Sequence, residues 1–387
     1  MKIGFYLTHM DRSDGIRRYN RDLIYGISRL PFDKKIYLWT TWGERKTLQK
    51  SFGQTPHVQY AGQFPRPSLL GGASRRVIAK WNGLLLKKNV DRWGIDVIHF
   101  PDPNHIPTPH KGMEKLVCTI HDLLPADPMS PDFSARTKRI FQYNLNNIMT
   151  YSRLVFVPSR FVKQELLQRF PRHEKQVQVT HEGASGKFRP NSIDWNLLKT
   201  YGLKEGAPFF LYIGYFVSRR NLLKLLEAFS MLPKKLRNSF RLVFLGGGWL
   251  TSNIYQKAQE LKIFEQFIHI KGVLDEHLVH LYNAAFALTY VSLSEGFGLP
   301  LLEAMQCGCP VITSNCSCMP EIAGDAALLV DPYNVESIRD GMLQLIEKPD
   351  LRRSLIQKGF ERAKEFSWEK MAKETYEGYK AVIAGKV

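Results

Sequence analysis

The sequence lacks any apolar run approaching the ~20 residues needed to cross a bilayer, and only five of its 387 residues are cysteines. A small, odd number of cysteines favours reduced thiols, as in a cytoplasmic protein, over a disulfide framework. The opening residues, MKIGFYLTHMDR, carry no small-residue cleavage site, so they predict a first buried strand rather than a signal peptide. We therefore expect a cytoplasmic protein.

Internal repeats and low-complexity segments are also absent from the sequence. With 44% hydrophobic and 12% aromatic residues, the chain can fill two hydrophobic cores, and its length suits two domains better than one. Wholesale disorder is not compatible with this composition.

Acidic residues are scarce in the first half of the chain, so most of the net charge of +18 belongs to that half. Residues 1–195 contain 31 Lys and Arg against 16 Asp and Glu, a balance of +15, whereas residues 196–387 contain 23 against 20, a balance of +3. Such a surface suits an anionic partner: phospholipid, nucleic acid or a phosphorylated substrate. A merely soluble basic protein would explain the sign of the charge but not its distribution.

Short apolar runs alternate with amphipathic stretches along the whole chain, which is typical of parallel sheets covered by helices. The runs expected to form strands are KIGFYL, KIYLWT, DVIHF, LVCTI, LVFVPS and VQVTHEG in the first half, and PFFLYIG, FRLVFLGGG, FIHIKG, AFALTYVS, PVITS and AALLVD in the second. Helices are expected between them, including residues 221–231 and 275–284. Residues 186–206 lack clear periodicity, so we expect a linker there. This order predicts an α/β protein with two doubly wound domains, 1–190 and 191–368, and a ligand in the cleft between them.

The stretch SEGFGLPLLEAMQCGCPVI, residues 294–312, carries the strongest functional signal. It predicts a helix that begins near Pro300 and ends at Gly308, preceded by a glycine-containing loop after a buried strand. A helix N-terminus offers N–H groups to a phosphate, and glycine lets a ligand approach the backbone. Glu295 and Glu303 can accept hydrogen bonds from hydroxyl groups, so a nucleotide sugar meets both demands. Taken alone, such a turn is a common α/β connection in which glutamates simply cap a helix.

The run YVSLSEGFGLPLLEAMQCGCPVITSNCSCMPEIAGDAALLVDP resembles the nucleotide-sugar signature of retaining glycosyltransferase family 4, whose glutamate–seven residues–glutamate motif is matched by Glu295 and Glu303. The segments DGIRRYNRDLIYGI, TIHDLLP, GASGKFRP, YIGYFVSRRNLLKLLEAF and FSWEKMAKETYEGY match the layout of that family in the same order. The resemblance implies the GT-B fold: two Rossmann-like domains with an inter-domain cleft, and a C-terminal helix, 369–387, that packs back toward the N-terminal, acceptor-binding domain.

The resemblance also implies how a nucleotide-sugar donor is held by the C-terminal domain. Glu295 would contact the transferred sugar, and Glu303 would hold the ribose. The backbone amides expected to hold the sugar and the diphosphate belong to Gly296, Phe297, Gly298 and Leu299.

Five further positions are compared with the family through the same resemblance. Arg219 and Arg220 match an Arg–Lys pair that neutralises the departing diphosphate, and arginine at 220 keeps the charge while adding a bidentate fork. Tyr215 stands where some relatives carry another arginine. His121 would lie in the cleft beside the donor sugar, and Gly15 would let the N-terminal backbone close over the phosphates. Read without the resemblance, the arginines form an ordinary solvated helix start, the histidine is structural, and Asp-Gly announces only a turn.

The implied chemistry is sugar transfer with retained anomeric configuration through an oxocarbenium-like transition state, while negative charge grows on the diphosphate. Arg219, Arg220 and the helix dipole would stabilise that charge, and the sequence has no DxD-type motif, so we expect neither a metal nor another cofactor. The four cysteines at 307, 309, 316 and 318 form two C-x-C pairs. Zinc sites usually show C-x₂₋₄-C spacing, so small apolar filler is the favoured interpretation.

The acceptor side is indicated by residues 75–92, RRVIAKWNGLLLKKNVDR. Apolar residues recur there at helical spacing (Val77, Ile78, Trp81, Leu84 and Leu85), and basic residues fall on a different face (Arg76, Lys80 and Lys87). A basic amphipathic helix of this kind can lie on an anionic membrane. A surface helix packed on the N-terminal sheet fits the pattern as well.

The sequence thus predicts a metal-independent, retaining hexosyltransferase of surface polysaccharide biosynthesis, with a lipid-linked or saccharide acceptor, at the inner face of the cytoplasmic membrane. GDP-mannose is the favoured donor, and UDP- and dTDP-sugars stay open. A GT-B epimerase or phosphorylase would share the fold, and a non-catalytic basic protein that binds membrane or nucleic acid would explain the charge. The sequence offers no recognised nucleic-acid motif, so we expect no nucleic-acid partner.

Overall fold

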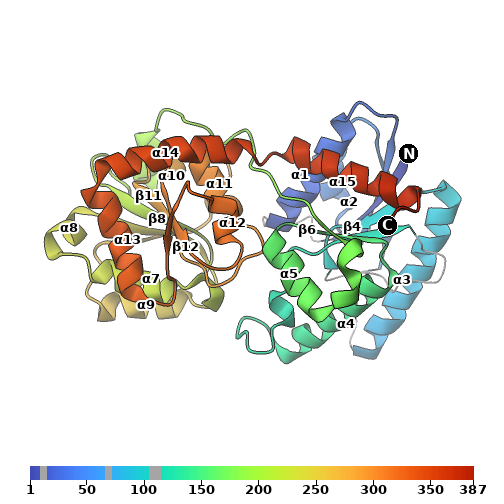
Figure 1. Ribbon diagram of the computed structural model, residues 1–387, viewed down its shortest axis with the longest axis horizontal. Helices are drawn as coiled ribbons and strands as arrows, with labels where there is room; N and C mark the ends of the chain where they lie inside the picture. Colours follow the sequence, from blue (N-terminus) through green and yellow to red (C-terminus); the bar gives the residue numbers. More distant parts are fainter. Residues whose placement is uncertain (9–14, 66–71, 104–114) are drawn as a thin grey trace. The chain divides into compact units, whose positions relative to one another are not determined.

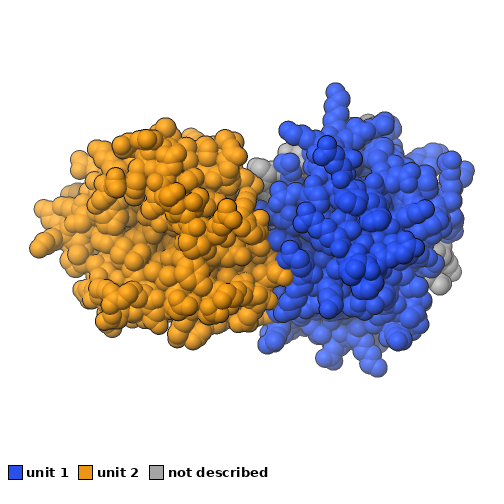
Figure 2. Space-filling model, turned by 90° about the horizontal axis from the view of Figure 1, so that it is seen from above, with its two compact units in different colours: residues 1–182, 368–387 blue, residues 183–367 orange. Residues whose placement is uncertain are grey.

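The computed structural model of the chain describes residues 1–8, 15–65, 72–103 and 115–387, without the side chains of residues 72–79. These residues form two compact units: unit 1 is 1–182 together with 368–387, and unit 2 is 183–367 (Figure 2). The first division falls after Glu182 rather than after residue 190, and the last helix belongs to unit 1.

Unit 1 is built on a parallel sheet in the order β3-β2-β1-β4-β5-β6-β7. Helices cover this sheet from both sides (Figure 1), so both faces of its central strands are buried. The sequences of these strands are therefore continuous runs of apolar residues. The strands are β1 (Lys2–Leu7), β2 (Lys35–Thr41), β3 (Val58–Phe64), β4 (Val97–Phe100), β5 (Leu116–Thr119), β6 (Leu154–Val157) and β7 (Val177–Val179). The helices are α1 (Gly15–Arg29), α2 (Arg45–Phe52), α3 (Gly72–Trp93), η3 (Leu124–Ala126), α4 (Ala135–Tyr151), α5 (Arg160–Arg169), η4 (Pro171–Gln176) and α15 (Trp368–Ile383).

Helix α15 packs closely on α1 and on the sheet of unit 1 (Figure 1). Gly26 of α1 allows this approach, since a Cβ there would meet the Cβ of Ala372 at 2.5 Å. Tyr379 of α15 also reaches the buried His99 of β4, whose Nδ1 lies 2.5 Å from the tyrosine oxygen. Burial and the nearby His121 lower the pKa of His99 to about 3, so this contact is made by a neutral imidazole.

Unit 2 contains a second parallel sheet, in the order β10-β9-β8-β11-β12-β13. Its strands are β8 (Phe209–Tyr215), β9 (Arg241–Gly247), β10 (Phe267–Ile270), β11 (Ala287–Tyr290), β12 (Val311–Ser314) and β13 (Leu328–Val330). Its helices are α6 (Trp195–Thr200), η5 (Ser218–Arg220), α7 (Leu222–Ser230), α8 (Lys234–Ser239), α9 (Thr251–Glu260), α10 (Leu278–Ala284), α11 (Leu299–Gln306), α12 (Met319–Ala323), α13 (Val335–Glu347) and α14 (Pro349–Lys364). Both units are therefore doubly wound α/β folds.

The segment expected to be a linker, 186–206, is an ordered part of unit 2. The backbone N–H of Asn191 donates to the side-chain oxygen of Asn283 at 2.9 Å, and Phe188 packs edge-on against Tyr282. Asp194 caps the short helix α6 by accepting from the N–H of Leu197. The contacts of Asn191 and Phe188 are made with α10, which lies far along the chain from this segment. Local periodicity therefore could not reveal them.

Helix α3 occupies the expected position but presents a different apolar face. Leu86 is fully buried against the sheet, whereas Trp81 and Leu84 are 58% and 54% exposed. The side chains of Arg76, Val77 and Ile78, which the predicted faces include, lie outside the described part of the chain. Among the described residues, no helix combines the length and apolarity that a membrane crossing requires.

Candidate functional site

The carboxyl edge of the second sheet brings two distant sequence segments together. The strand order reverses between β8 and β11, and ligands of doubly wound folds bind where such a reversal occurs. Strand β8 leads into the turn η5 with Arg219 and Arg220, and β11 leads into the loop with Glu295. The backbone N–H of Leu293 donates to the carbonyl of Arg219 at 2.8 Å, so the two segments are joined directly.

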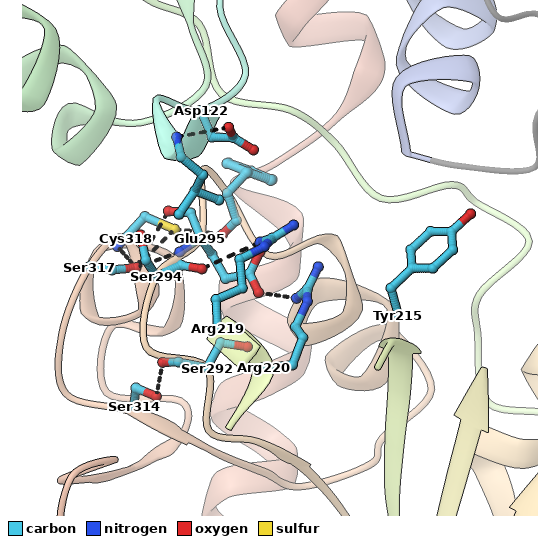
Figure 3. A network of polar contacts seen from close by, with 12 residues as sticks. Asp122, Tyr215, Arg219, Arg220, Ser292, Ser294, Glu295, Ser314, Ser317 and Cys318 are labelled. Carbon is cyan, nitrogen blue, oxygen red and sulfur yellow. Dashed lines mark hydrogen bonds and ion pairs between the residues drawn. The ribbon is translucent and has the colours of Figure 1, made fainter. Parts of the chain in front are cut away.

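Arg219, Arg220 and Glu295 form one polar cluster at this edge (Figure 3). Nη1 of Arg219 lies 3.1 Å from one oxygen of Glu295, and Nη1 of Arg220 pairs with the other oxygen. The guanidinium of Arg220 also lies over the ring of Tyr290 at 5.0 Å, a cation–π contact. The side chain of Glu295 is 7% exposed, so its charge is sheltered from water. The structure thus brings together three residues that the sequence assigned to the donor.

Asn221 fixes the arginine turn and was missed by the sequence analysis. It adopts a left-handed conformation with φ of 60°, which asparagine tolerates better than most residues. Its side-chain nitrogen donates to the carbonyls of Val291 and Pro332 at 3.2 and 2.6 Å, and the residue is buried. An asparagine that directly follows two arginines is the only sequence signal for this role.

The loop before α11 is held by its own side chains and by the neighbouring turn. Gly298 is the N-cap of α11 at φ of 99°, and a Cβ there would also meet Met319 at 2.8 Å, so glycine is required for local reasons. Phe297 is buried edge-on against Phe366. The N–H of Glu295 donates to Oγ of Ser317 at 3.1 Å. The loop, which includes Gly296 and Leu299, follows Glu295 of the arginine cluster directly, and its contact with a donor stays a prediction.

Glu303 lies on α11 and is buried with Tyr282 of α10. The hydroxyl of Tyr282 donates to Oε2 of Glu303 at 2.8 Å. Tyr282 is fully buried and was missed by the sequence analysis, because nothing in the sequence relates it to a carboxylate 21 residues away. Tyr215 differs from both: it is 57% exposed and points away from the arginine cluster in Figure 3.

His121 of unit 1 has acceptors at both ring nitrogens. Nε2 lies 2.9 Å from the carbonyl oxygen of Pro101, and Nδ1 lies 3.1 Å from Oε1 of Glu182. Burial alone lowers the pKa of His121, but Glu182, the Pro101 carbonyl and Asp102 together raise it above its ordinary value. The raised pKa and the two acceptors favour the imidazolium form, in which each ring nitrogen donates an N–H within unit 1. The edge of Tyr19 closes one side, with ring centroids 4.6 Å apart.

Glu182 is a functional candidate that the sequence analysis did not select. It lies just after β7 in the run VQVTHEG, 61 residues from His121, and its side chain is 7% exposed. A carboxylate directly after a buried strand was the available signal. Gly15 begins α1, and a Cβ there would meet no atom of the described residues within 4 Å.

Three of the four cysteines of the donor segment are buried thiols, and Cys316 is half-buried. Burial raises the pKa of Cys307 and of Cys309 to about 12, so both are protonated at neutral pH, whereas zinc binds thiolates. Cys318 is buried with its sulfur 3.2 Å from the carbonyl of Phe297. Within the described residues, no group of three or more His, Cys, Asp or Glu side chains is arranged to hold a metal ion. The burial of Cys307, Cys309 and Cys318 suits small packing residues, an interpretation that stays a prediction.

Known proteins resemble this chain along its whole length. Residues 13–185 match the family described as "Glycosyltransferase Family 4", and residues 194–362 match "Glycosyl transferases group 1". O-antigen chain mannosyltransferase B of Escherichia coli is 34% identical over 277 residues, which cover 70% of this chain and 71% of that protein. The serotype-specific mannosyltransferase WbdA of Escherichia coli is 26% identical over 278 residues, 70% of this chain but only 34% of that longer protein.

The fold has close counterparts among solved structures as well. Anabaena HepE, solved in complex with UDP and glucose, superposes with a TM-score of 0.75 at 16% identity over 98% of this chain and 100% of its own. Its two units have the same doubly wound organisation as those described above. From the sequence match over most of both chains and from this architecture, the chain belongs to glycosyltransferase family 4 and has the GT-B fold.

Proposed function

We propose that this glycosyltransferase transfers mannose from GDP-mannose to a saccharide or lipid-linked acceptor in surface polysaccharide biosynthesis, with retention of anomeric configuration and without a metal ion. The mannosyl donor is suggested by the named activities of O-antigen chain mannosyltransferase B and WbdA. HepE was solved with UDP and glucose, so UDP-sugars are the alternative that any test must include.

The observation that carries the proposal is the cluster of Arg219, Arg220 and Glu295 beside the N-terminus of α11. Two fixed guanidinium groups and the first amides of a helix suit the two phosphates of a nucleotide sugar. Glu303, one helical turn further on, suits the hydroxyls of the ribose. All four charged side chains belong to unit 2, so this unit supplies the donor grip by itself.

In the proposed reaction, the bond between the anomeric carbon and the diphosphate breaks, and its electrons remain on the diphosphate oxygen. The acceptor hydroxyl forms the new glycosidic bond on the same face of the sugar and passes its proton to the departing diphosphate oxygen. Arg219 and Arg220 stabilise the growing negative charge, since they are already in place and need little reorganisation. His121, with both N–H groups engaged inside unit 1, contributes a fixed positive charge and does not act as a proton acceptor.

An anionic membrane surface is the proposed site of the acceptor, with α3 as the contact. Trp81 and Leu84 are exposed and lie three positions apart on this helix, and Lys88 is exposed four positions after Leu84. Exposed aromatic and aliphatic side chains next to lysine are typical of helices at a lipid surface. The positive charge of Lys87 is partly neutralised, because its Nζ lies 3.0 Å from Oδ2 of Asp91.

Calorimetry with the purified protein tests the donor. We expect GDP-mannose to bind more tightly than GDP-glucose, UDP-glucose and dTDP-glucose, and mannose to appear on a lipid-linked acceptor in the presence of EDTA. Loss of transfer with EDTA that Mg²⁺ restores would contradict metal-free transfer. Preference for a UDP-sugar would correct the donor while leaving the transferase assignment intact.

Sedimentation with phosphatidylglycerol vesicles tests the membrane contact. Each lysine near the surface is worth about 1 kcal/mol, so changing Lys80, Lys87 and Lys88 to Glu should weaken vesicle binding by more than about tenfold at low salt. Donor binding should be unchanged, because the donor residues belong to unit 2. The matched control reverses the charge of three exposed lysines of unit 2, Lys204, Lys234 and Lys235. Wild-type protein that stays in the supernatant at low salt excludes the membrane contact.

A further inference from the structure

Glu295 already occupies the two arginines that a diphosphate would use (Figure 3). Each oxygen of its carboxylate accepts a hydrogen bond from a different guanidinium, so the carboxylate is bridged by both. The side chains of Arg219 and Arg220 are 21% and 12% exposed, so water screens this pairing only weakly. A diphosphate that reaches the arginines therefore competes with a carboxylate that is already bound to them.

Glu295 and a diphosphate compete for the same atoms of the arginines, because Nη1 of Arg219 and Nη1 of Arg220 both donate to the carboxylate. When a diphosphate takes these two atoms, Glu295 loses both donors while it stays buried, and a buried charge without partners is costly. Each guanidinium has further N–H groups, and Nε of Arg220 is buried without a hydrogen-bond partner within the described residues. Pairing both anions with the arginines would still hold two negative charges beside each other.

The sugar of a nucleotide sugar lowers the cost of separating Glu295 from the arginines. Its hydroxyl groups can donate to the released carboxylate, whereas a free nucleoside diphosphate has no hydroxyl groups at that position. The free diphosphate also carries about one more negative charge, because its terminal phosphate is not esterified. It is therefore repelled more strongly by Glu295 than the donor is.

We infer that Glu295 is a specificity-determining residue: it competes with the diphosphate for Arg219 and Arg220 and so makes the site prefer a nucleotide sugar to the free nucleoside diphosphate. The inference rests on the proposed function, because it places the donor at these arginines. It extends that function to product release. After transfer, Glu295 has lost the sugar hydroxyls, returns to the arginines and displaces the nucleoside diphosphate.

The substitution Glu295→Gln tests this inference because it removes the charge and keeps the shape of the side chain. Calorimetry with GDP and GDP-mannose, and in parallel with UDP and UDP-glucose, measures both affinities. We expect the free diphosphate to bind about tenfold or more tightly than to wild type, because the repelling charge is gone. Binding of the nucleotide sugar should gain far less, since the amide accepts weaker hydrogen bonds from the sugar. The wild-type preference for the nucleotide sugar should then shrink by about tenfold or more.

Glu227→Gln is the matched control in the same unit. Glu227 pairs with Lys257, with Nζ 2.6 Å from Oε1, and lies on α7 outside the arginine cluster. Its substitution should leave both affinities unchanged. Glu295→Asp is the second variant, because it keeps the charge on a shorter side chain that cannot bridge both arginines. Its gain in diphosphate affinity should be intermediate. Circular dichroism reports which variants are folded.

Two outcomes separate this inference from the proposed function. If wild type binds the nucleotide sugar but folded Glu295→Gln protein binds GDP and UDP no more tightly than wild type, the competition does not exist. If wild type binds none of the four nucleotides, the proposed donor site fails and the inference fails with it.

Discussion

The ion pair between His121 and Glu182 gives the protein a defined dependence on pH. Glu182→Gln keeps the shape of the side chain and removes its charge, so Nδ1 of His121 can still donate to an amide oxygen. The wild-type contact of 3.1 Å is a hydrogen bond between two charged groups, worth about 1.5–3 kcal/mol, whereas a neutral one is worth about 0.5–1.5 kcal/mol. Because both side chains are largely buried, little screening applies, and the variant should lose about 1–2 kcal/mol.

The sign of the pH dependence follows from the raised pKa of His121. A group whose pKa is higher in the folded than in the unfolded protein stabilises the fold below the ordinary value of 6.5, and this contribution disappears as the pH rises through the folded pKa. The groups facing the imidazole are Glu182, Asp102, Tyr19 and His99, and the two carboxylates favour its charged form. Glu182→Gln should therefore destabilise unit 1 more at pH 6 than at pH 9.

Two measurements check this prediction. NMR titration of labelled histidine should show a lower pKa of His121 in the variant than in wild type. Thermal unfolding should show a lower midpoint at pH 6, by about 2–4 °C for each kcal/mol lost, with a smaller difference at pH 9. Glu174→Gln, at an exposed position of the same unit, is the control and should change neither. An unchanged titration of His121, or equal destabilisation at both pH values, would refute the imidazolium–carboxylate assignment.

The remaining predictions concern the donor grip and the packing of α15. Glu303→Ala should weaken donor binding by about 1.5–3 kcal/mol in calorimetry, and Tyr282→Phe should weaken it in the same direction by less, because the carboxylate keeps its charge but loses one positioning hydrogen bond. Unchanged affinity in a folded Glu303→Ala protein would remove this carboxylate from the site. Replacing Arg219 and Arg220 together with Ala should lower turnover at least about 100-fold in a single-turnover assay, since both act where charge develops. Gly26→Val should lower the thermal stability of unit 1 by at least about 1–3 kcal/mol, because a larger side chain would collide with α15.

The alternation of apolar and amphipathic segments was enough to predict two parallel sheets, because central parallel strands are buried on both faces and read as continuous apolar runs. The prediction missed β3, Val58–Phe64, whose sequence VQYAGQF contains two glutamines and a glycine. This strand is at the edge of its sheet and most of its residues are only half-buried, so it does not need the composition of a central strand. Periodicity alone could not separate it from a loop.

Residues that we propose to contact a ligand were easier to find than the residues that position them. The sequence selected Glu295 and Glu303 from the glycine-containing loop and the helix of one segment, and His121 through the resemblance to the family. It did not select Tyr282 or Glu182, because each contacts its partner across 21 or 61 residues of chain. Such pairs depend on which helices and strands become neighbours, and a single sequence does not contain that information in a local pattern.

The proposed donor site depends on how the strands and the arginine turn are aligned more than on any one charged residue. Arg219 and Glu295 are 76 positions apart, and they meet because β8 and β11 are neighbouring parallel strands whose carboxyl ends lie at one edge. Asn221 then fixes the position of the arginine turn. Its side-chain nitrogen donates both to the carbonyl of Val291, just after β11, and to the carbonyl of Pro332, just after β13. A lysine at 220 could supply the charge, but only a turn held in this way lets two guanidinium groups bridge the two oxygens of one carboxylate. The geometry that pairs the arginines with Glu295 is therefore also the geometry that would present them to the proposed diphosphate.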